Sequence, residues 1–408
     1  MGSGRETNRY SPRRTGQVNP DSVMTVSMLA AAAFFSAAAL RICDAMLPRL
    51  ASDFGVSAGT AGGVIIWFTV AYGLVQVLFG PLGDRYGKAL LVRLALTGCA
   101  AASLASALAP DFEVLVWTRV AWDVAAAGVI PLVMARIGDT VPYEQRQATL
   151  ARLLTGTISG MMAGQLAGGL FAESPAGWRA AFISLSAGYA AVAILLTVST
   201  RQSPASISLR PGASSQEPMA QQLLGVLRLP WPRVILLAVL AEGFFLLGPM
   251  SYLPTYLHLH HKLSLSRASA LTALNAVGGL AYALTASRIV GRFGEARMVM
   301  AGGWFMGAGF LAWWMSPLPW LAGAIALVVG FGTYLYHNTL QTHATQMAPT
   351  VRGTSVALFA SFLFVGQALG VAATGYVVDH FGFTPVLLSA AVALPVAGWG
   401  FARALRRP

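Results

Sequence analysis

The sequence Gly80-Pro81-Leu82-Gly83-Asp84-Arg85-Tyr86-Gly87-Lys88 is a short stretch that begins within the end of one long apolar run, residues 61–83, and precedes another, residues 90–109. Each run is long enough to cross a bilayer, because a spanning helix needs roughly 20 apolar residues. The stretch places glycines, an acid and two bases where the chain leaves one helix and enters the next. Since glycine permits tight turns, we expect a compact, charged connection between two membrane helices.

Apolar runs of this length recur along all 408 residues, of which 56% are hydrophobic and only 10% charged. Soluble proteins are typically about 25% charged, so the composition excludes a soluble globular protein. The other runs fall at roughly residues 24–48, 113–137, 150–172, 180–200, 233–257, 268–289, 298–316, 320–345, 354–378 and 385–403. The pattern predicts an all-α membrane protein with twelve transmembrane helices.

Positive charges indicate the topology. Most of the 27 Lys and Arg residues fall in the polar tail 1–23, in alternate connections, in residues 201–232 and at the C-terminus. Cytoplasmic loops carry such an excess, so we expect a multi-pass protein of the cell (inner) membrane with both termini cytoplasmic. The tail lacks the apolar core of a secretory signal. Topology thus accounts for the net charge of +12, and we expect no nucleic-acid partner.

The predicted helices divide into two halves that repeat each other. Residues 201–232 are a polar, Pro/Ser-rich linker between a bundle at 24–200 and a second bundle, with a short basic tail, at 233–408. The repeated features are Arg85-Tyr86-Gly87 with Arg292-Phe293-Gly294, Pro142 and Arg146 with Pro349 and Arg352, and Gly164-Gln165-x-x-Gly168 with Gly366-Gln367-x-x-Gly370. Duplicated halves with a site between them are typical of secondary transporters.

The Gly80–Lys88 stretch resembles the loop motif between helices two and three of the major facilitator superfamily, and the resemblance extends over nearly the whole chain after the tail. It implies the two-bundle major facilitator fold and a gating motif formed by Gly80, Asp84, Arg85, Gly87 and Lys88. In the second copy Gly291 and Glu295 replace the acid and the closing base, so we expect the first half to dominate any latch. A topogenic turn without gating is the alternative.

The run 150–172 carries Gly156, Gly160, Gly164 and Gly168 near one helix face, where a partner helix can approach closely. Its segment GMMAGQLAGG, residues 160–169, resembles the antiporter signature of drug efflux members, with Gln165 in place of proline. The subgroup that the chain most resembles is the bacterial arabinose-efflux-like and drug:proton antiporters. This resemblance favours a secondary transporter that exports drugs or metabolites in exchange for protons by alternating access.

Charged residues within the predicted helices are candidates for proton coupling, because each costs roughly 2.5–3.5 kcal/mol at bilayer depth. Arg119 resembles the buried arginine of a family motif associated with proton coupling, and Asp123 either pairs with it or titrates itself. Asp44 either pairs with Arg41 or carries a proton, whereas Glu242 has no oppositely charged residue three or four positions away. We therefore rank Asp44 and Glu242 first.

Five residues on helices that line the cavity in the resembled family are candidate substrate contacts: Arg41, Tyr72, Phe245, His337 and Gln341. Aromatic and apolar lining suits a lipophilic or amphipathic solute. For the aromatic residues the alternative is lipid contact, and for His337 and Gln341 it is a plain interhelical hydrogen bond.

Motifs of enzymes and metal sites are missing from the sequence, so we expect no enzyme, no cofactor and no metal. There is no phosphate-binding loop and no HExxH sequence. Cys43 and Cys99 lack metal-ligand spacing, and His258, His260 and His261 fit an exposed turn better than a metal site. The expected partners are a small-molecule substrate, protons and the lipid bilayer, with the protein as a monomer.

Two other functions remain open. The first is a proton-coupled symporter that imports an organic anion or a sugar, with Arg41 and Arg119 as substrate anchors. The second, less favoured because no nucleophile–base set stands out, is a non-transporting membrane sensor or a membrane-embedded enzyme.

Overall fold

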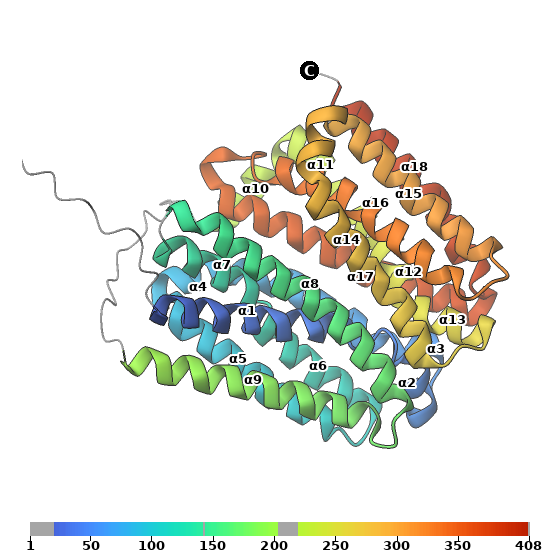
Figure 1. Ribbon diagram of the computed structural model, residues 1–408, viewed down its shortest axis with the longest axis horizontal. Helices are drawn as coiled ribbons and strands as arrows, with labels where there is room; N and C mark the ends of the chain where they lie inside the picture. Colours follow the sequence, from blue (N-terminus) through green and yellow to red (C-terminus); the bar gives the residue numbers. More distant parts are fainter. Residues whose placement is uncertain (1–19, 142, 203–218, 407–408) are drawn as a thin grey trace, which may run out of the picture.

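The computed structural model describes residues 20–141, 143–202 and 219–406, and over these ranges its regular structure is helical, without strands. Figure 1 shows two bundles of long helices, one coloured blue to green and the other yellow to red. The first bundle contains α1 (Pro20–Arg41), α2 (Leu47–Phe54), α3 (Ala58–Ala61), α4 (Gly63–Tyr86), α5 (Lys88–Ala107), α6 (Phe112–Ala126), α7 (Val129–Thr140), α8 (Tyr143–Glu173) and α9 (Gly177–Gln202).

The second bundle follows the same plan. It contains α11 (Pro230–Glu242), the π-helical turn η1 (Gly243–Leu247), α12 (Gly248–Ser251), α13 (Leu253–His261), α14 (Leu265–Phe293), α15 (Glu295–Met315), α16 (Leu321–Ala344), the 3₁₀ turn η2 (Pro349–Val351), α17 (Arg352–Phe381) and α18 (Thr384–Ala404). With interrupted helices counted as one span each, the described residues form twelve spans, six in each bundle.

The predicted linker contains an element that its polar composition did not predict. A short helix, α10 (Met219–Arg228), precedes α11, which begins at Pro230 rather than at residue 233. Its apolar residues Leu223, Val226 and Leu227 pack on the core of the second bundle, so tertiary contact stabilises a helix within a polar sequence. Residues 203–218 of the linker and residues 1–19 of the tail lie outside the described residues.

Breaks within spans lie beside buried acids. The turn between α1 and α2 contains Asp44, and Pro48 stands in the first turn of α2. Glu242 is the last residue of α11, directly before the π-helical turn, and Pro249 and Pro254 follow it in α12 and α13. Proline and π turns interrupt the regular hydrogen bonding of a helix. Two acids therefore lie where the backbone departs from a straight helix.

Glycines let paired helices touch through their backbones. Gly156, Gly160, Gly164 and Gly168 of α8 face α1, where an added Cβ would meet the carbonyl oxygens of Ala30, Phe34, Ala38 and Ile42. In the second bundle Gly366 and Gly370 of α17 face the carbonyl oxygens of Leu240 and Phe244. The spacing along the chain is the same for both partners of this contact: Leu240 and Phe244 stand as far after Ala38 and Ile42 as Gly366 and Gly370 stand after Gly164 and Gly168. The two bundles therefore repeat one packing contact.

The bundles meet through α4 with α17 and α8 with α14. Hydrogen bonds between them gather at one end of the molecule, which we call the closed end. There Asp379 accepts from Ser57 Oγ at 2.6 Å and from Gly59 N–H at 3.0 Å, and Ser266 Oγ donates to Glu173 at 2.5 Å. In Figure 1 the bundles converge near α2, α3 and α13.

Length and composition suit a bilayer. Nine segments within the described residues are long and apolar enough to cross it, and large apolar side chains such as Leu284, Trp117 and Trp67 are exposed. One large hydrophobic core fills each bundle, and the core of the first also includes Tyr252, Leu265 and Val371 of the second. The predicted fold class, an all-α membrane protein with twelve helices in two pseudo-symmetric bundles, is confirmed.

We expect Gly164→Ala to destabilise the protein by about 1–3 kcal/mol, because the new methyl group would press on the Ala38 carbonyl. Gly138→Ala is the matched control, since Gly138 is also helical but a methyl group added there would meet no atom within 4 Å. Thermal unfolding of the purified protein in detergent measures both. Equal midpoints for the two variants would show that the α1–α8 contact tolerates a side chain.

Candidate functional site

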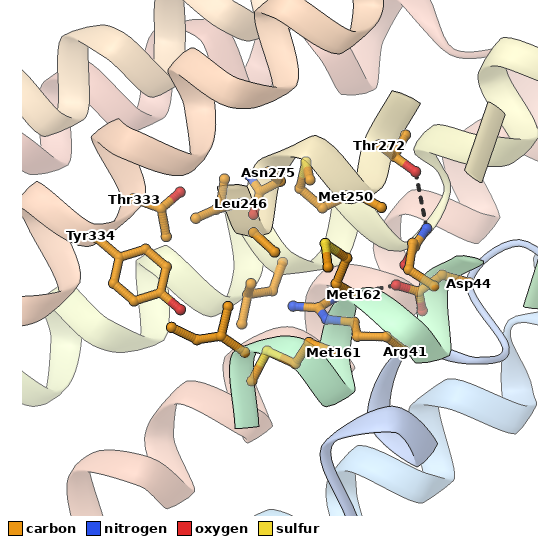
Figure 2. Close-up of a pocket in the computed structure, with 15 residues that line it drawn as sticks. Arg41, Asp44, Met161, Met162, Leu246, Met250, Thr272, Asn275, Thr333 and Tyr334 are labelled. Atoms are coloured by element: carbon orange, nitrogen blue, oxygen red, sulfur yellow. Dashed lines mark hydrogen bonds and ion pairs between the residues drawn. The ribbon is translucent and has the colours of Figure 1, made fainter. Parts of the chain in front are cut away.

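A cavity of about 70 Å³ lies between the two bundles. Its lining comes from the end of α1 and from α8, η1, α12, α14 and α16: Arg41, Asp44, Ile158, Met161, Met162, Gln165, Leu246, Leu247, Met250, Thr272, Ala273, Asn275, Ala276, Thr333 and Tyr334. Figure 2 shows Arg41 and Tyr334 extending into it from opposite sides. Most of the wall is apolar, with polar groups at a few points, as in small-molecule sites generally.

Arg41 and Asp44 form an ion pair in the cavity wall. Arg41 Nη1 lies 3.3 Å from Asp44 Oδ2, and the Asp44 side chain is almost fully buried. The other carboxylate oxygen, Oδ1, has no hydrogen-bond partner among the described residues. The arginine side chain is 21% exposed, so it remains accessible from the cavity. The pair thus presents a cationic group to a ligand and keeps one acceptor atom unused.

Gln165 bridges the bundles beside the cavity. Its Nε2 donates to Thr272 Oγ1 at 3.1 Å, and its backbone carbonyl accepts from Ser269 Oγ at 2.6 Å. The dashed line at Thr272 in Figure 2 marks the first of these bonds. A proline at this position would have no side-chain amide to donate, so the departure from the resembled signature adds a contact between the bundles.

Glu242 is paired across the second bundle. Its two carboxylate oxygens lie 3.1 and 3.0 Å from Nδ1 of His337 on α16. Glu242 is 1% exposed, whereas the His337 side chain is 23% exposed. The sequence singled out both residues but not their pairing, because the partner lies on a distant helix. A buried carboxylate that contacts a partly accessible imidazole has a route for exchanging a proton.

Arg119 lies against aromatic rings rather than against Asp123. Its guanidinium carbon is 3.8 Å from the ring centre of Phe68 and 4.7 Å from that of Trp122, and Nη2 donates to the Ala39 carbonyl at 3.4 Å. Neither carboxylate oxygen of Asp123 has a hydrogen-bond partner among the described residues. Of the two alternatives for this helix, the structure does not form the intrahelical ion pair.

Four of the five predicted substrate contacts lie away from this cavity. Tyr72 is buried with its ring 4.5 Å from that of Phe364, and Phe245 packs on the second core. His337 engages Glu242, and Gln341 is exposed. Arg41 alone of the five lines the cavity. The sequence analysis did not single out its methionines, Met161, Met162 and Met250, because apolar residues carry no distinguishing signal in a membrane helix.

The predicted gating motif forms the sharp turn between α4 and α5. Gly87 adopts a φ of 87°, which favours glycine. Lys88 Nζ lies 2.6 Å from Asp139 Oδ2 at the end of α7, and the Arg85 guanidinium lies over the ring of Tyr86. An added Cβ at Gly80 would have open space. The Asp84 side chain lies outside the described residues, so its latch stays a prediction.

Candidate metal ligands do not gather in the described part of the chain, where no group of three His, Cys, Asp or Glu residues could hold an ion. His260 stacks on the Tyr256 ring, and His261 packs edge-on against both rings. His258 Nδ1 contacts the Leu263 carbonyl at 2.7 Å. Cys43 and Cys99 are buried free thiols.

Comparison with known proteins places this architecture in a family. The chain is 25% identical over 354 residues to the uncharacterized MFS-type transporter YceJ of Bacillus subtilis strain 168, covering 84% of this chain and 88% of that one. A chloramphenicol resistance protein of Streptomyces lividans is 33% identical over 141 residues, 34% of this chain and 35% of that one. The crystal structure of the nucleoside transporter NupG superimposes with a TM-score of 0.75 at 14% identity, covering 94% of this chain and all of the other.

The sequence model of the Major Facilitator Superfamily matches residues 29–371 and 261–408, which together cover nearly the whole chain. The expectation that the protein is not an enzyme agrees with this match, since the family consists of transporters. The chain therefore belongs to the Major Facilitator Superfamily and is a multi-pass membrane transporter.

Proposed function

We propose that this transporter exports small molecules across the cell membrane in exchange for protons. The observation that carries the proposal is the Arg41–Asp44 pair, in which a buried carboxylate lies beside an accessible guanidinium in the wall of a cavity between the bundles. A group that gains a proton when it faces one side and loses it when it faces the other couples the proton gradient to alternating access.

The positive-inside rule supports placing the end of the molecule with Arg85, Lys88, Arg292 and Arg297 in the cytoplasm. Both termini are then cytoplasmic. The closed end faces outward, and the hydrogen bonds of Asp379 with Ser57 and Gly59 keep the outer side shut in this conformation. Export then requires these bonds to break so that the bundles can separate on the outside.

Two acids serve as proton carriers in this proposal. Asp44 lies in the cavity wall beside Arg41, where a substrate contacting either residue alters the environment of the other. Glu242 exchanges protons through His337, whose imidazole can both accept and donate a proton. Arg119 and Asp123 are buried in the first bundle. Arg119 contributes a permanent positive charge, and Asp123, whose carboxylate oxygens have no hydrogen-bond partner among the described residues, is a further candidate proton carrier.

Several relatives are resistance proteins, including the chloramphenicol protein and the quinolone resistance protein NorA of Staphylococcus aureus, which matches 31% of this chain. A lining of methionine thioethers, aliphatic groups and one tyrosine suits a lipophilic solute with a polar group. We therefore propose lipophilic drugs or metabolites as the substrate class. Thermal stabilisation of the purified protein by a panel of such compounds identifies the substrate, because binding to the folded state raises the midpoint.

Uptake of an organic anion with protons is the second candidate. Arg41 favours it, because an accessible guanidinium in the cavity is a suitable anchor for a carboxylate.

The transport assay uses inverted vesicles and a compound identified by the stabilisation screen. We expect the vesicles to accumulate this compound when their interior is acidic, because protons leave as the compound enters. Intact cells should then show lower accumulation than cells without the protein. Net accumulation in intact cells, driven by an inward proton gradient, would instead support the symport alternative.

We expect Glu242→Gln to abolish proton-driven flux while counterflow exchange persists, because the amide keeps the shape of the site but cannot release a proton. The matched control is Glu113→Gln, which changes an exposed glutamate in the first turn of α6. Reconstituted vesicles with and without a pH gradient measure both activities. Unchanged pH-driven flux in Glu242→Gln would remove Glu242 from the coupling pathway.

We expect Asp379→Ala to increase the outward-open population several-fold, because it removes two hydrogen bonds that join the bundles at the closed end. Spin labels at Leu108→Cys and Leu259→Cys, both exposed positions on opposite bundles, report the separation. The control is Asp139→Ala, which breaks a contact within one bundle. Identical distance distributions in Asp379→Ala and the unmodified protein would argue against a gating role.

A further inference from the structure

Arginines from the α14–α15 connection and from the segment after α18 line one groove of the second bundle. Arg292 at the end of α14, Arg297 at the start of α15 and Arg406 after α18 line a hollow of about 570 Å³. Arg406 also lines an adjoining hollow of about 320 Å³ with Arg403, Trp399 and Met300. We call the two hollows together the arginine groove.

The positive charge of this groove is not neutralised within the part of the chain that the structure describes. There the guanidinium groups of Arg292, Arg297 and Arg406 have no hydrogen-bond or ion-pair partner. Glu295 also lines the groove, with a carboxylate oxygen 3.0 Å from Nε2 of His343, and its single negative charge leaves the three arginines with a positive excess. The groove therefore offers several unengaged, permanently charged donors to an anion.

Topology explains the sign of these charges but not their convergence. The positive-inside rule is satisfied by bases anywhere in a cytoplasmic loop, whereas here Arg406, from the end of the chain, joins Arg292 and Arg297 of the α14–α15 connection in one groove. The first bundle differs at the matching position: Lys88, which corresponds to Glu295, is paired with Asp139 at 2.6 Å.

Exposed aromatic side chains border the charged groups. Phe293 is 50% exposed and Trp399 is 53% exposed, and the Arg403 guanidinium lies 5.4 Å from the Trp399 ring centre. Tryptophan beside arginine at the end of a transmembrane helix is typical of the level of the lipid headgroups. A site that is cationic in the groove and apolar at its rim fits a molecule with a phosphate head and an acyl body.

We propose that the arginine groove binds the headgroup phosphate of an anionic phospholipid, whose acyl chains lie along the outer surface of α15 and α18 near Trp399. Guanidinium groups bind phosphate through paired hydrogen bonds, and basic pockets between membrane helices bind anionic headgroups. This site is separate from the cavity between the bundles and does not depend on proton coupling.

The test uses the full-length protein in a neutral detergent, titrated with phosphatidylglycerol or with phosphatidylcholine. Native mass spectrometry counts the bound lipids, and thermal unfolding reports stabilisation. We expect phosphatidylglycerol to bind and to raise the midpoint, and the effect to weaken as salt is added. Equal binding of phosphatidylcholine would overturn the proposal. Stabilisation by inorganic phosphate or glycerol 3-phosphate at the same concentration would assign the groove to a free anion instead.

The triple variant Arg292→Gln, Arg297→Gln, Arg406→Gln should lose about a hundredfold in phosphatidylglycerol affinity, since each base near an anionic surface contributes roughly fivefold. The corresponding triple lysine variant keeps the charge and should retain most of the binding, which guards against loss through misfolding. Arg152→Gln is the matched control, because Arg152 is an exposed arginine near the start of α8. Undiminished binding in the triple Gln variant, or an equal loss in Arg152→Gln, would overturn the assignment.

Discussion

An ionised group inside a low-dielectric helix bundle has to be paired, stacked against aromatic rings or neutralised, and this requirement organises both halves of the protein. In the first bundle Asp44 pairs with Arg41 where α1 ends, and Arg119 lies over the ring of Phe68. In the second bundle His337 holds Glu242 directly before a π-helical turn. The charged groups thus lie at breaks and crossings of helices, and the apolar cores fill the remaining volume.

Close backbone contact joins paired helices within each bundle. The glycines of α8 against α1, and Gly366 and Gly370 of α17 against Leu240 and Phe244, leave no room for side chains between the paired helices. Between the bundles the contacts include polar bonds such as those of Asp379 and Gln165, which can exchange with water. Glycines also bring the bundles close together, since an added Cβ at Gly59 would meet the Gly375 carbonyl oxygen and one at Gly169 that of Leu265. Separation of the bundles therefore breaks both backbone contacts and hydrogen bonds.

Periodicity and composition predicted the helices, their number and the duplicated halves, because bilayer thickness and the exclusion of charge act on every span separately. The glycine pattern indicated a close-packed face because glycines four residues apart lie near one side of a helix. Ion pairs between distant helices could not be predicted from the sequence, because nothing local to Glu242 indicates His337 and nothing near Lys88 indicates Asp139. The helix α10 was missed because its stability comes from packing on the second core rather than from its own sequence.

The two bundles share a scaffold but differ in the chemistry of their ion pairs. At matching positions the first bundle has Lys88 with Asp139, and the second has Glu295 with His343, so the polarity is reversed and the base is an imidazole. The pair formed by Glu242 also uses an imidazole, that of His337. A lysine can only donate hydrogen bonds, whereas an imidazole can donate from one ring nitrogen and accept at the other. The two bundles therefore use matching positions of one scaffold for different hydrogen-bonding chemistry.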